Sequence, residues 1–219
     1  MLSYPRMSRP VTELSLRSAC EAGHAMKGKD DATRAEATDA NDFFNRGLAH
    51  AAKRNYDKAI QEYDQAIRLY PTWGEALVAR GAAHGDLGQY DRAIQDLDKA
   101  IGFNPDLANA FGQRGRAYLL KGLYDRAIQD LDQAIRLNPN DADALNTRAA
   151  ALAEKGQYDR AIQDSEAAIR IDPNLAEAYY NRGLALTALG RPRQAAVDFS
   201  TASELNPNLP SPERSPRSA

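Results

Sequence analysis

The sequence predicts an all-α fold built from repeated pairs of antiparallel helices. The nine-letter stretch YDRAIQDLD begins at Tyr90 and recurs 34 residues later at Tyr124. Looser copies begin at Tyr56 and Tyr158. A fixed period of this length is typical of stacked helical repeats. It divides the chain into five units of 34 residues, at 40–73, 74–107, 108–141, 142–175 and 176–209.

Small residues recur at fixed places in the units. The eighth place is Gly or Ala, and the twentieth and twenty-seventh places are Ala in all five units. Two antiparallel helices that are joined by a short turn approach closely only where neither carries a bulky side chain. The pattern therefore predicts that the eighth and twentieth places face each other within each pair. The twenty-seventh place would pack against the following unit.

Glycine and proline mark where the helices end. Gly88, Gly122, Gly156 and Gly190 suit the turn inside each pair, and Arg54 departs from this rule in the first unit. Proline at the thirty-second place of every unit ends the second helix. Within that helix, Ala59, Ile60, Ala66, Ile67 and Leu69 with their equivalents form an apolar stripe that we expect in the core.

Charged residues on the second helices have the spacing of weak ion pairs. Arg92 with Asp96, and the equivalent residues of the third and fourth units, stand four apart. Such pairs contribute a few tenths of a kcal/mol at most, so we expect a solvated face and no site.

This pattern resembles the tetratricopeptide repeat, a 34-residue helix-turn-helix motif, over all five units. The resemblance implies a right-handed superhelical solenoid of antiparallel helix pairs. One departure is systematic, because the seventh place holds arginine where the family most often has leucine. We expect a structural row of arginines paired with neighbouring acids: Arg46, Arg80, Arg114, Arg148 and Arg182.

The two ends of the stack differ from its middle. We expect residues 1–39 to be largely disordered, with a leader helix near 31–40 as one alternative and an N-cap at Asp39 as the other. In the last unit Ala196 and Ser203 replace isoleucines, which suggests that this unit caps itself. The tail at 210–219 is rich in Ser, Pro and Arg, and we expect it to be disordered as well.

Composition excludes several classes of protein. A net charge of -2 argues against a dedicated nucleic-acid binder. No apolar run is long enough for a membrane span, and the single cysteine, Cys20, leaves cytoplasm as the default location. His50 and His84 stand 34 apart, too far for one metal ion, and we interpret them as structural. We find no motif for a cofactor, a metal or catalysis, and we expect a noncatalytic protein.

In proteins that this sequence resembles, places 2, 5, 6, 9, 12 and 13 of each unit line a concave groove. These places hold five acidic residues and one basic residue, so the groove would favour a neutral to basic peptide. Amides at the sixth place of alternate units resemble an interrupted asparagine ladder of the O-linked N-acetylglucosamine transferases, although asparagine on a helix can also be simply soluble. The resemblance selects as groove residues Phe44, Asn45, Leu48, Val78, Gln113, Arg116, Asn146, Tyr180, Asn181 and Leu184.

These observations lead to one main hypothesis of function and one alternative. The main hypothesis is a protein-protein interaction adaptor that binds a peptide segment of a partner in the groove, as a monomer or weak homo-oligomer. The alternative is a structural module that assembles with copies of itself through the N-terminal end of the stack. Met1 and the tail lead us to expect a complete chain, without an attached catalytic domain.

Overall fold

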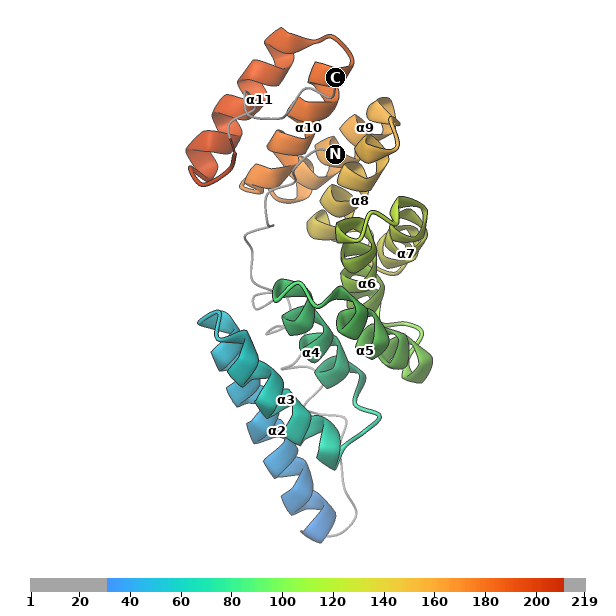
Figure 1. Cartoon of the computed structure of the whole chain (residues 1–219), viewed down its shortest axis with the longest axis vertical. Helices are drawn as coiled ribbons and strands as arrows, with labels where there is room; N and C mark the ends of the chain where they lie inside the picture. Colours follow the sequence, from blue (N-terminus) through green and yellow to red (C-terminus); the bar gives the residue numbers. More distant parts are fainter. Residues whose placement is uncertain (1–30, 211–219) are drawn as a thin grey trace. The chain divides into compact units, whose positions relative to one another are not determined.

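The computed structural model describes residues 31–210, and within this range the chain folds into ten α-helices, α2 to α11 (Figure 1). Their bounds are α2 Asp31–Ala52, α3 Tyr56–Leu69, α4 Gly74–Asp86, α5 Tyr90–Phe103, α6 Ala108–Leu120, α7 Tyr124–Leu137, α8 Ala142–Glu154, α9 Tyr158–Ile171, α10 Ala176–Ala188 and α11 Pro192–Leu205. Each 34-residue repeat contains two helices, although α2 begins before residue 40. The all-α repeat fold is therefore confirmed.

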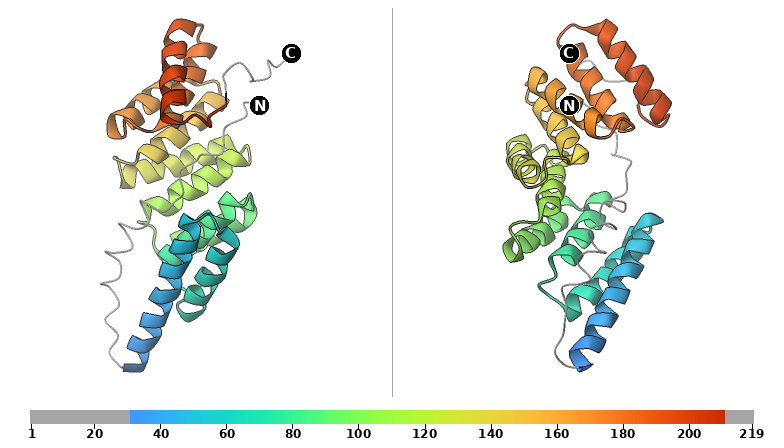
Figure 2. Two further views of the ribbon diagram at one scale, coloured as in Figure 1. Left: turned by 90° about the vertical axis from the view of Figure 1, so that its left-hand side faces the viewer. Right: turned by 180° about the vertical axis from the view of Figure 1, so that it is seen from behind.

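The described chain forms two compact units, residues 31–117 and 118–210, which divide inside α6. In the first unit α2 lies beside α3, and α4 lies beside α5 (Figures 1 and 2). In the second unit α8 pairs with α9, and α10 pairs with α11 (Figure 2). Each pair is joined by a short turn, so its two helices run antiparallel.

The turn inside each pair needs a left-handed backbone at one residue. Four repeats place a glycine there, with φ between 72° and 76°, as at Gly88 and Gly156. The first repeat places Arg54 there, with φ of 59°. A side chain in this region of backbone space costs about 1–2 kcal/mol, because Cβ crowds the carbonyl oxygen. The first turn is therefore strained where the other four are relaxed.

The turn between repeats depends on a residue that we did not single out in the sequence. The side chain of Asn104 accepts a hydrogen bond of 3.0 Å from the backbone N–H two residues later, at Asp106. Asn138, Asp172 and Asn206 make the same bond at the same place of their repeats. This side chain substitutes for a backbone turn and ends the second helix together with the following proline.

The small residues lie in the core, and the expected approach of the eighth and twentieth places is present in the second repeat, where a Cβ at Gly81 would lie 3.2 Å from the carbonyl oxygen of Ala93. The alanines at the twentieth and twenty-seventh places are at most 1% exposed. The glycine at the eighth place faces a large side chain at the twenty-fourth place. A Cβ at Gly47 would overlap the ring of Tyr63, and one at Gly183 would stand 2.7 Å from Phe199.

The fourth repeat reverses this choice of sizes. Its eighth place is Ala149 and its twenty-fourth place is Ser165, and both are fully buried. The other repeats combine a glycine with Tyr, Leu or Phe at these places. The two places therefore share one volume between the helices, which explains why alanine is tolerated in this repeat alone.

The apolar stripe of the second helix is only partly in the core. Ala59 and Ala66 are fully buried, as we predicted, and Ile60 and Ile67 pack against the same cluster. Leu69 is 39% exposed and its equivalent Phe103 is 51% exposed, so our prediction for this place was wrong. The place is the last residue of the second helix and faces outward.

The ends of the repeat array are visible within the described range. Helix α2 begins at Asp31, nine residues before the first 34-residue repeat. Asp39 therefore lies inside the helix. At the other end Ala196 and Ser203 of α11 are exposed, which suits a unit with no repeat after it. Our expectations for residues 1–30 and 211–219 lie outside the described residues.

Candidate functional site

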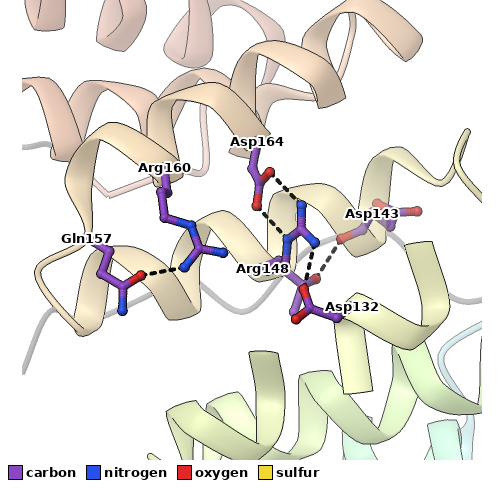
Figure 3. Close-up of polar contacts among 7 residues, drawn as sticks. Asp132, Asp143, Arg148, Gln157, Arg160 and Asp164 are labelled. Atoms are coloured by element: carbon purple, nitrogen blue, oxygen red, sulfur yellow. Dashed lines mark hydrogen bonds and ion pairs between the residues drawn. The ribbon is translucent and has the colours of Figure 1, made fainter. Parts of the chain in front are cut away.

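Two arginines at the seventh place, Arg80 and Arg148, bind acids of two successive second helices (Figure 3 for Arg148). Arg148 on α8 donates from Nε and Nη2 to both oxygens of Asp164 on α9, at 2.7 and 2.8 Å. Its Nη1 donates to Asp132 on α7 at 2.7 Å. One guanidinium thus joins three helices of two repeats.

The same arrangement recurs along the chain. Arg80 donates two bonds to Asp96 and one to Asp64, each between 2.6 and 2.8 Å. Hydrogen bonding to Asp96 is the main cause that raises the pKa of Arg80, and burial opposes it. The predicted pairing of the arginines is confirmed, since Arg46, Arg114 and Arg182 also bind acids, namely Glu62, Asp98 and Asp198.

This row corrects our interpretation of the second-helix charges. Asp96 and Asp164 are buried, and they bind the arginines of the first helices. Arg92 and Arg160 donate instead to the nearby amides of Gln89 and Gln157 (Figure 3 for Arg160). The expected pairs of Arg92 with Asp96 and of Arg160 with Asp164 were therefore wrong, because these two aspartates turn inward.

A second set of contacts joins repeats across 30 residues. The hydroxyl of Tyr124 donates to Glu154 at 3.0 Å, and Tyr56 makes the equivalent bond with Asp86. Burial is the main cause that raises the pKa of both tyrosines. Thirty residues after Tyr90 and Tyr158 the sequence has Leu120 and Ala188, whose side chains cannot accept such a bond. This contact is therefore specific to alternate junctions between repeats.

Two of the predicted groove residues bind each other in the second unit. Asn181 on α10 donates from Nδ2 to the Oδ1 of Asn146 on α8, at 2.8 Å. Asn146 is 1% exposed and Asn181 is 4% exposed. This bond leaves the Nδ2 of Asn146 as a donor and the Oδ1 of Asn181 as an acceptor. The same combination of groups is what a peptide bond requires of its partner.

The remaining groove residues differ in how much surface they offer. Phe44, Leu48, Val78 and Tyr180 are at most 5% exposed. The ring of Phe44 packs against Tyr63 and Trp73, with centroids 5.8 and 4.8 Å apart, so it belongs to the core. Asn45 is exposed, and Gln113, Arg116 and Leu184 are half-buried.

The acidic groups of the groove places gather in the second unit. We call the groove places of α8 and α10 the α8–α10 face. Its residues are Asp143, Asn146, Thr147, Ala150, Ala153, Glu154, Glu177, Tyr180, Asn181, Leu184, Thr187 and Ala188. It contains Asp143, Glu154 and Glu177 and no basic residue. In the first unit the groove places hold two acids, and one of them, Asp86, forms a 3.1 Å ion pair with Arg116. The α8–α10 face is thus the strongly acidic part of the groove places.

The histidines lie between helices of the first unit. His84 is 9% exposed, and its Nδ1 lies 2.9 Å from Oε1 of Gln89. The Nδ1 of His50 is buried and has no hydrogen-bond partner among the described residues. Among residues 31–210, no three His, Cys, Asp or Glu side chains come together as a metal site would require. None of the helices in the described part of the chain has the length and apolar character of a membrane span.

Models of the tetratricopeptide repeat family match most of the chain. The model described as TPR repeat matches residues 83–122, 115–155 and 150–190. Two models described as Tetratricopeptide repeat match residues 40–73 and 176–209. No curated protein matches the chain in sequence.

Solved structures of repeat proteins resemble the chain. A crystal structure of MamA is 30% identical, with a TM-score of 0.61, and the match covers 74% of this chain and 94% of that one. The structure of TTC0263, a thermophilic TPR protein of Thermus thermophilus, is 21% identical with a TM-score of 0.68, over 77% and 92% of the two chains. YrrB, described as a TPR protein with an unusual peptide-binding site, is 21% identical with a TM-score of 0.59, over 90% and 94%.

The period, the helix pairs and these matches agree with one another, and the chain belongs to the tetratricopeptide repeat family of protein-interaction repeats.

Proposed function

We propose that this protein is a noncatalytic adaptor that binds an extended peptide segment of a partner on the first-helix surface of its repeats. The observation that carries the proposal is the amide pair of Asn146 and Asn181, which joins two successive first helices. Beside this bond the pair carries a further donor group, the Nδ2 of Asn146, and a further acceptor, the Oδ1 of Asn181. They match the C=O and N–H of an extended backbone without reading its side chains.

The charge of the α8–α10 face supports a choice of partner. Three acidic residues without a basic one favour a segment of neutral to basic character. The similarity to YrrB, which is described as having a peptide-binding site, supports the same kind of ligand. The groove residues of the first unit contribute less to the proposal, because Phe44 and Leu48 belong to a core cluster.

The proposal is tested with a displayed library of peptides and the purified full chain. We expect bound peptides that lose about tenfold or more in affinity when Asn181→Ala is introduced, since about 1.4 kcal/mol corresponds to a factor of ten. Asn174→Ala is the matched control, because Asn174 is exposed and lies in the turn before α10. Thermal unfolding of both variants verifies the fold.

Two results would overturn the proposal. One is a library without any binder. The other is a set of binders whose affinity is equal for both variants. Sedimentation at several protein concentrations runs alongside, and strong self-association without peptide binding would favour the structural module that assembles with its own copies.

A further inference from the structure

Two junctions between repeats carry the same tyrosine–acid contact but differ in what else the acid binds. In the first unit Tyr56 donates to Asp86, and Nη2 of Arg116 also donates to Asp86, at 3.1 Å. In the second unit Tyr124 donates to Oε2 of Glu154 at 3.0 Å. Each tyrosine stands 30 residues before its acid. The two acids therefore occupy equivalent places of their repeats.

The second junction has no arginine at the place that Arg116 occupies in the first. Arg116 follows Asp86 by 30 residues, whereas the residue that follows Glu154 by 30 is Leu184. The Oε1 of Glu154 is buried and has no hydrogen-bond partner among the described residues. Burying a carboxylate oxygen without a donor costs free energy, because the oxygen has lost its water without compensation. Leucine thus leaves this acid without the cation that its equivalent binds.

The basic residue that follows Glu154 directly has another partner. This residue is Lys155, and its Nζ binds Asp125. The other two acids of the α8–α10 face, Asp143 and Glu177, already interact with other groups of the chain. Glu154 is therefore the acid of this face whose carboxylate keeps an acceptor for an incoming group.

We infer that Glu154 binds an arginine side chain of the partner peptide, in the way that Asp86 binds Arg116 within the first unit. The inference rests on the proposed function, and it adds a side-chain contact to the backbone contacts of the amide pair. A guanidinium presents several N–H donors in one plane, which matches a carboxylate better than the ammonium of lysine does. The partner segment is thus one that contains arginine.

The place borders on the surface of the molecule. Arg116 keeps 17% of its side chain exposed while it binds Asp86. In the second unit Glu154 and Leu184 are both half-buried. Glu154 is also the last residue of α8. A guanidinium that enters beside Leu184 would therefore meet Oε1 after a rotation of the glutamate side chain.

One short peptide can span the distance between the amide pair and Glu154. Asn146 and Glu154 lie eight residues apart on α8, which is about 12 Å along the helix at about 1.5 Å per residue. An extended chain covers about 3.3 Å per residue, so this distance corresponds to about four residues. We therefore expect the arginine about four residues from the backbone group that meets the amide pair.

A double-mutant cycle with the purified full chain tests this contact. A peptide selected from the displayed library is synthesised again with each arginine replaced in turn by citrulline, which keeps the shape and removes the charge. At one arginine we expect citrulline to weaken binding about tenfold, and Glu154→Gln to weaken the original peptide by the same factor. The two changes together should weaken binding no further, because both remove the same interaction. Titration calorimetry measures each affinity.

Two sets of variants separate this contact from net charge. Glu166→Gln is the matched control, because Glu166 is exposed on α9 of the same unit and loses the same charge. It should change the affinity less than about twofold, since salt screens exposed charges. Leu184→Arg supplies the arginine of the first unit within the chain, so it should bind the peptide about tenfold more weakly than Leu184→Gln does. Unfolding temperatures report whether each variant is folded.

A small probe tests Glu154 without any library peptide. Nα-acetylarginine amide is titrated into the full chain, and the carboxyl carbon signals of Glu154 and Asp86 are followed by NMR. We expect the Glu154 signal to shift and the Asp86 signal to stay, because Arg116 already binds Asp86. The citrulline analogue should move neither signal, and Leu184→Arg should abolish the shift.

Three outcomes would overturn the inference. The selected peptides could bind equally well with citrulline at every arginine. The losses from citrulline and from Glu154→Gln could simply add. The citrulline analogue could shift the Glu154 signal as much as the arginine probe does. If Asn181→Ala still weakens the selected peptides in these cases, the proposed function stands while this inference fails. A library without binders would instead overturn the proposed function, and the probe would then decide whether Glu154 is an arginine site.

Discussion

In the first repeat Gly47 lies against the ring of Tyr63, whereas the fourth repeat has Ala149 and Ser165, both fully buried, at the same two places. The first repeat adds Phe44 and Trp73 to form an aromatic cluster. The fourth repeat has no aromatic side chain at the equivalent places, which hold Asn146 and Leu175. The same 34-residue plan therefore has a core of large rings in one repeat and of small side chains in the other.

The arginine of the fourth repeat forms more ion pairs than the arginine of the first repeat. Arg46 of the first repeat is half exposed and forms an ion pair with Glu62. Arg148 of the fourth repeat is 18% exposed and binds both Asp164 and Asp132. Asp141, the last residue of the third repeat, caps α8 of the fourth repeat, and its side chain accepts from the Ala144 N–H at 2.9 Å. The comparison teaches that ion pairs and caps replace aromatic packing within one repeat plan.

The largest expected effect concerns the arginines. Arg148→Met should cost about 3 kcal/mol of unfolding free energy, because it leaves the buried Asp164 without its partner. Arg46→Met should cost about 0.5 kcal/mol or less, as for an exposed ion pair. Urea denaturation of both variants measures the difference. Equal losses would contradict the contrast between the two repeats.

The next effect concerns the packing of the first repeat. Gly47→Ala should cost about 2 kcal/mol, because its Cβ would overlap the ring of Tyr63. Gly102→Ala is the control, since that helical glycine has nothing within 4 Å of a built Cβ. There alanine should stabilise by about 0.5–1 kcal/mol. Thermal unfolding compares the two variants. A change in melting temperature of the same sign for both would contradict the packing argument.

A smaller effect tests the shared volume in the fourth repeat. Ser165→Leu alone should cost about 1–2 kcal/mol, because leucine meets the methyl group of Ala149. Adding Ala149→Gly recreates the glycine and leucine of the second repeat, Gly81 and Leu97, and should recover that loss. A double-mutant cycle measures the coupling. Additive effects would show that the two places do not share a volume.

The smallest effect concerns the turns. Arg54→Gly should stabilise the protein by about 0.5–1 kcal/mol, since it removes the strain of a left-handed arginine. Gly156→Ala should destabilise it by a similar amount, because the backbone there has the same conformation. Calorimetry on the two variants should show melting temperatures that move in opposite directions.

The fold was predictable from the sequence because its signals repeat five times. A single glycine before Tyr90 or a single proline after Phe103 is weak evidence for a helix end. The same spacing in successive repeats makes the prediction strong. The place of Leu69 was misjudged, because helical periodicity does not show where the next repeat stops covering a helix. The pairing of Gly47 with Tyr63 escaped us, although the exception at Ala149 and Ser165 was visible in the sequence.

The candidate site was less predictable. Family resemblance selected Asn146 and Asn181, but a list of groove places does not say which two amides meet. It also grouped Phe44 with them, although this ring packs against Trp73 in the core. Packing between side chains of different helices decides both points, and a one-dimensional pattern does not contain it.

The arginine row and the tyrosine–acid contacts follow different periods, and this bears on how the gene can change in length. Arg80 and Arg148 each reach an acid 16 residues before and 16 residues after themselves, so any gain or loss of one whole repeat preserves their bonds. The contact of Tyr124 with Glu154 recurs only at every second junction. Among the first four repeats, a change that leaves neither Tyr56 nor Tyr124 without its acid must therefore add or remove repeats two at a time.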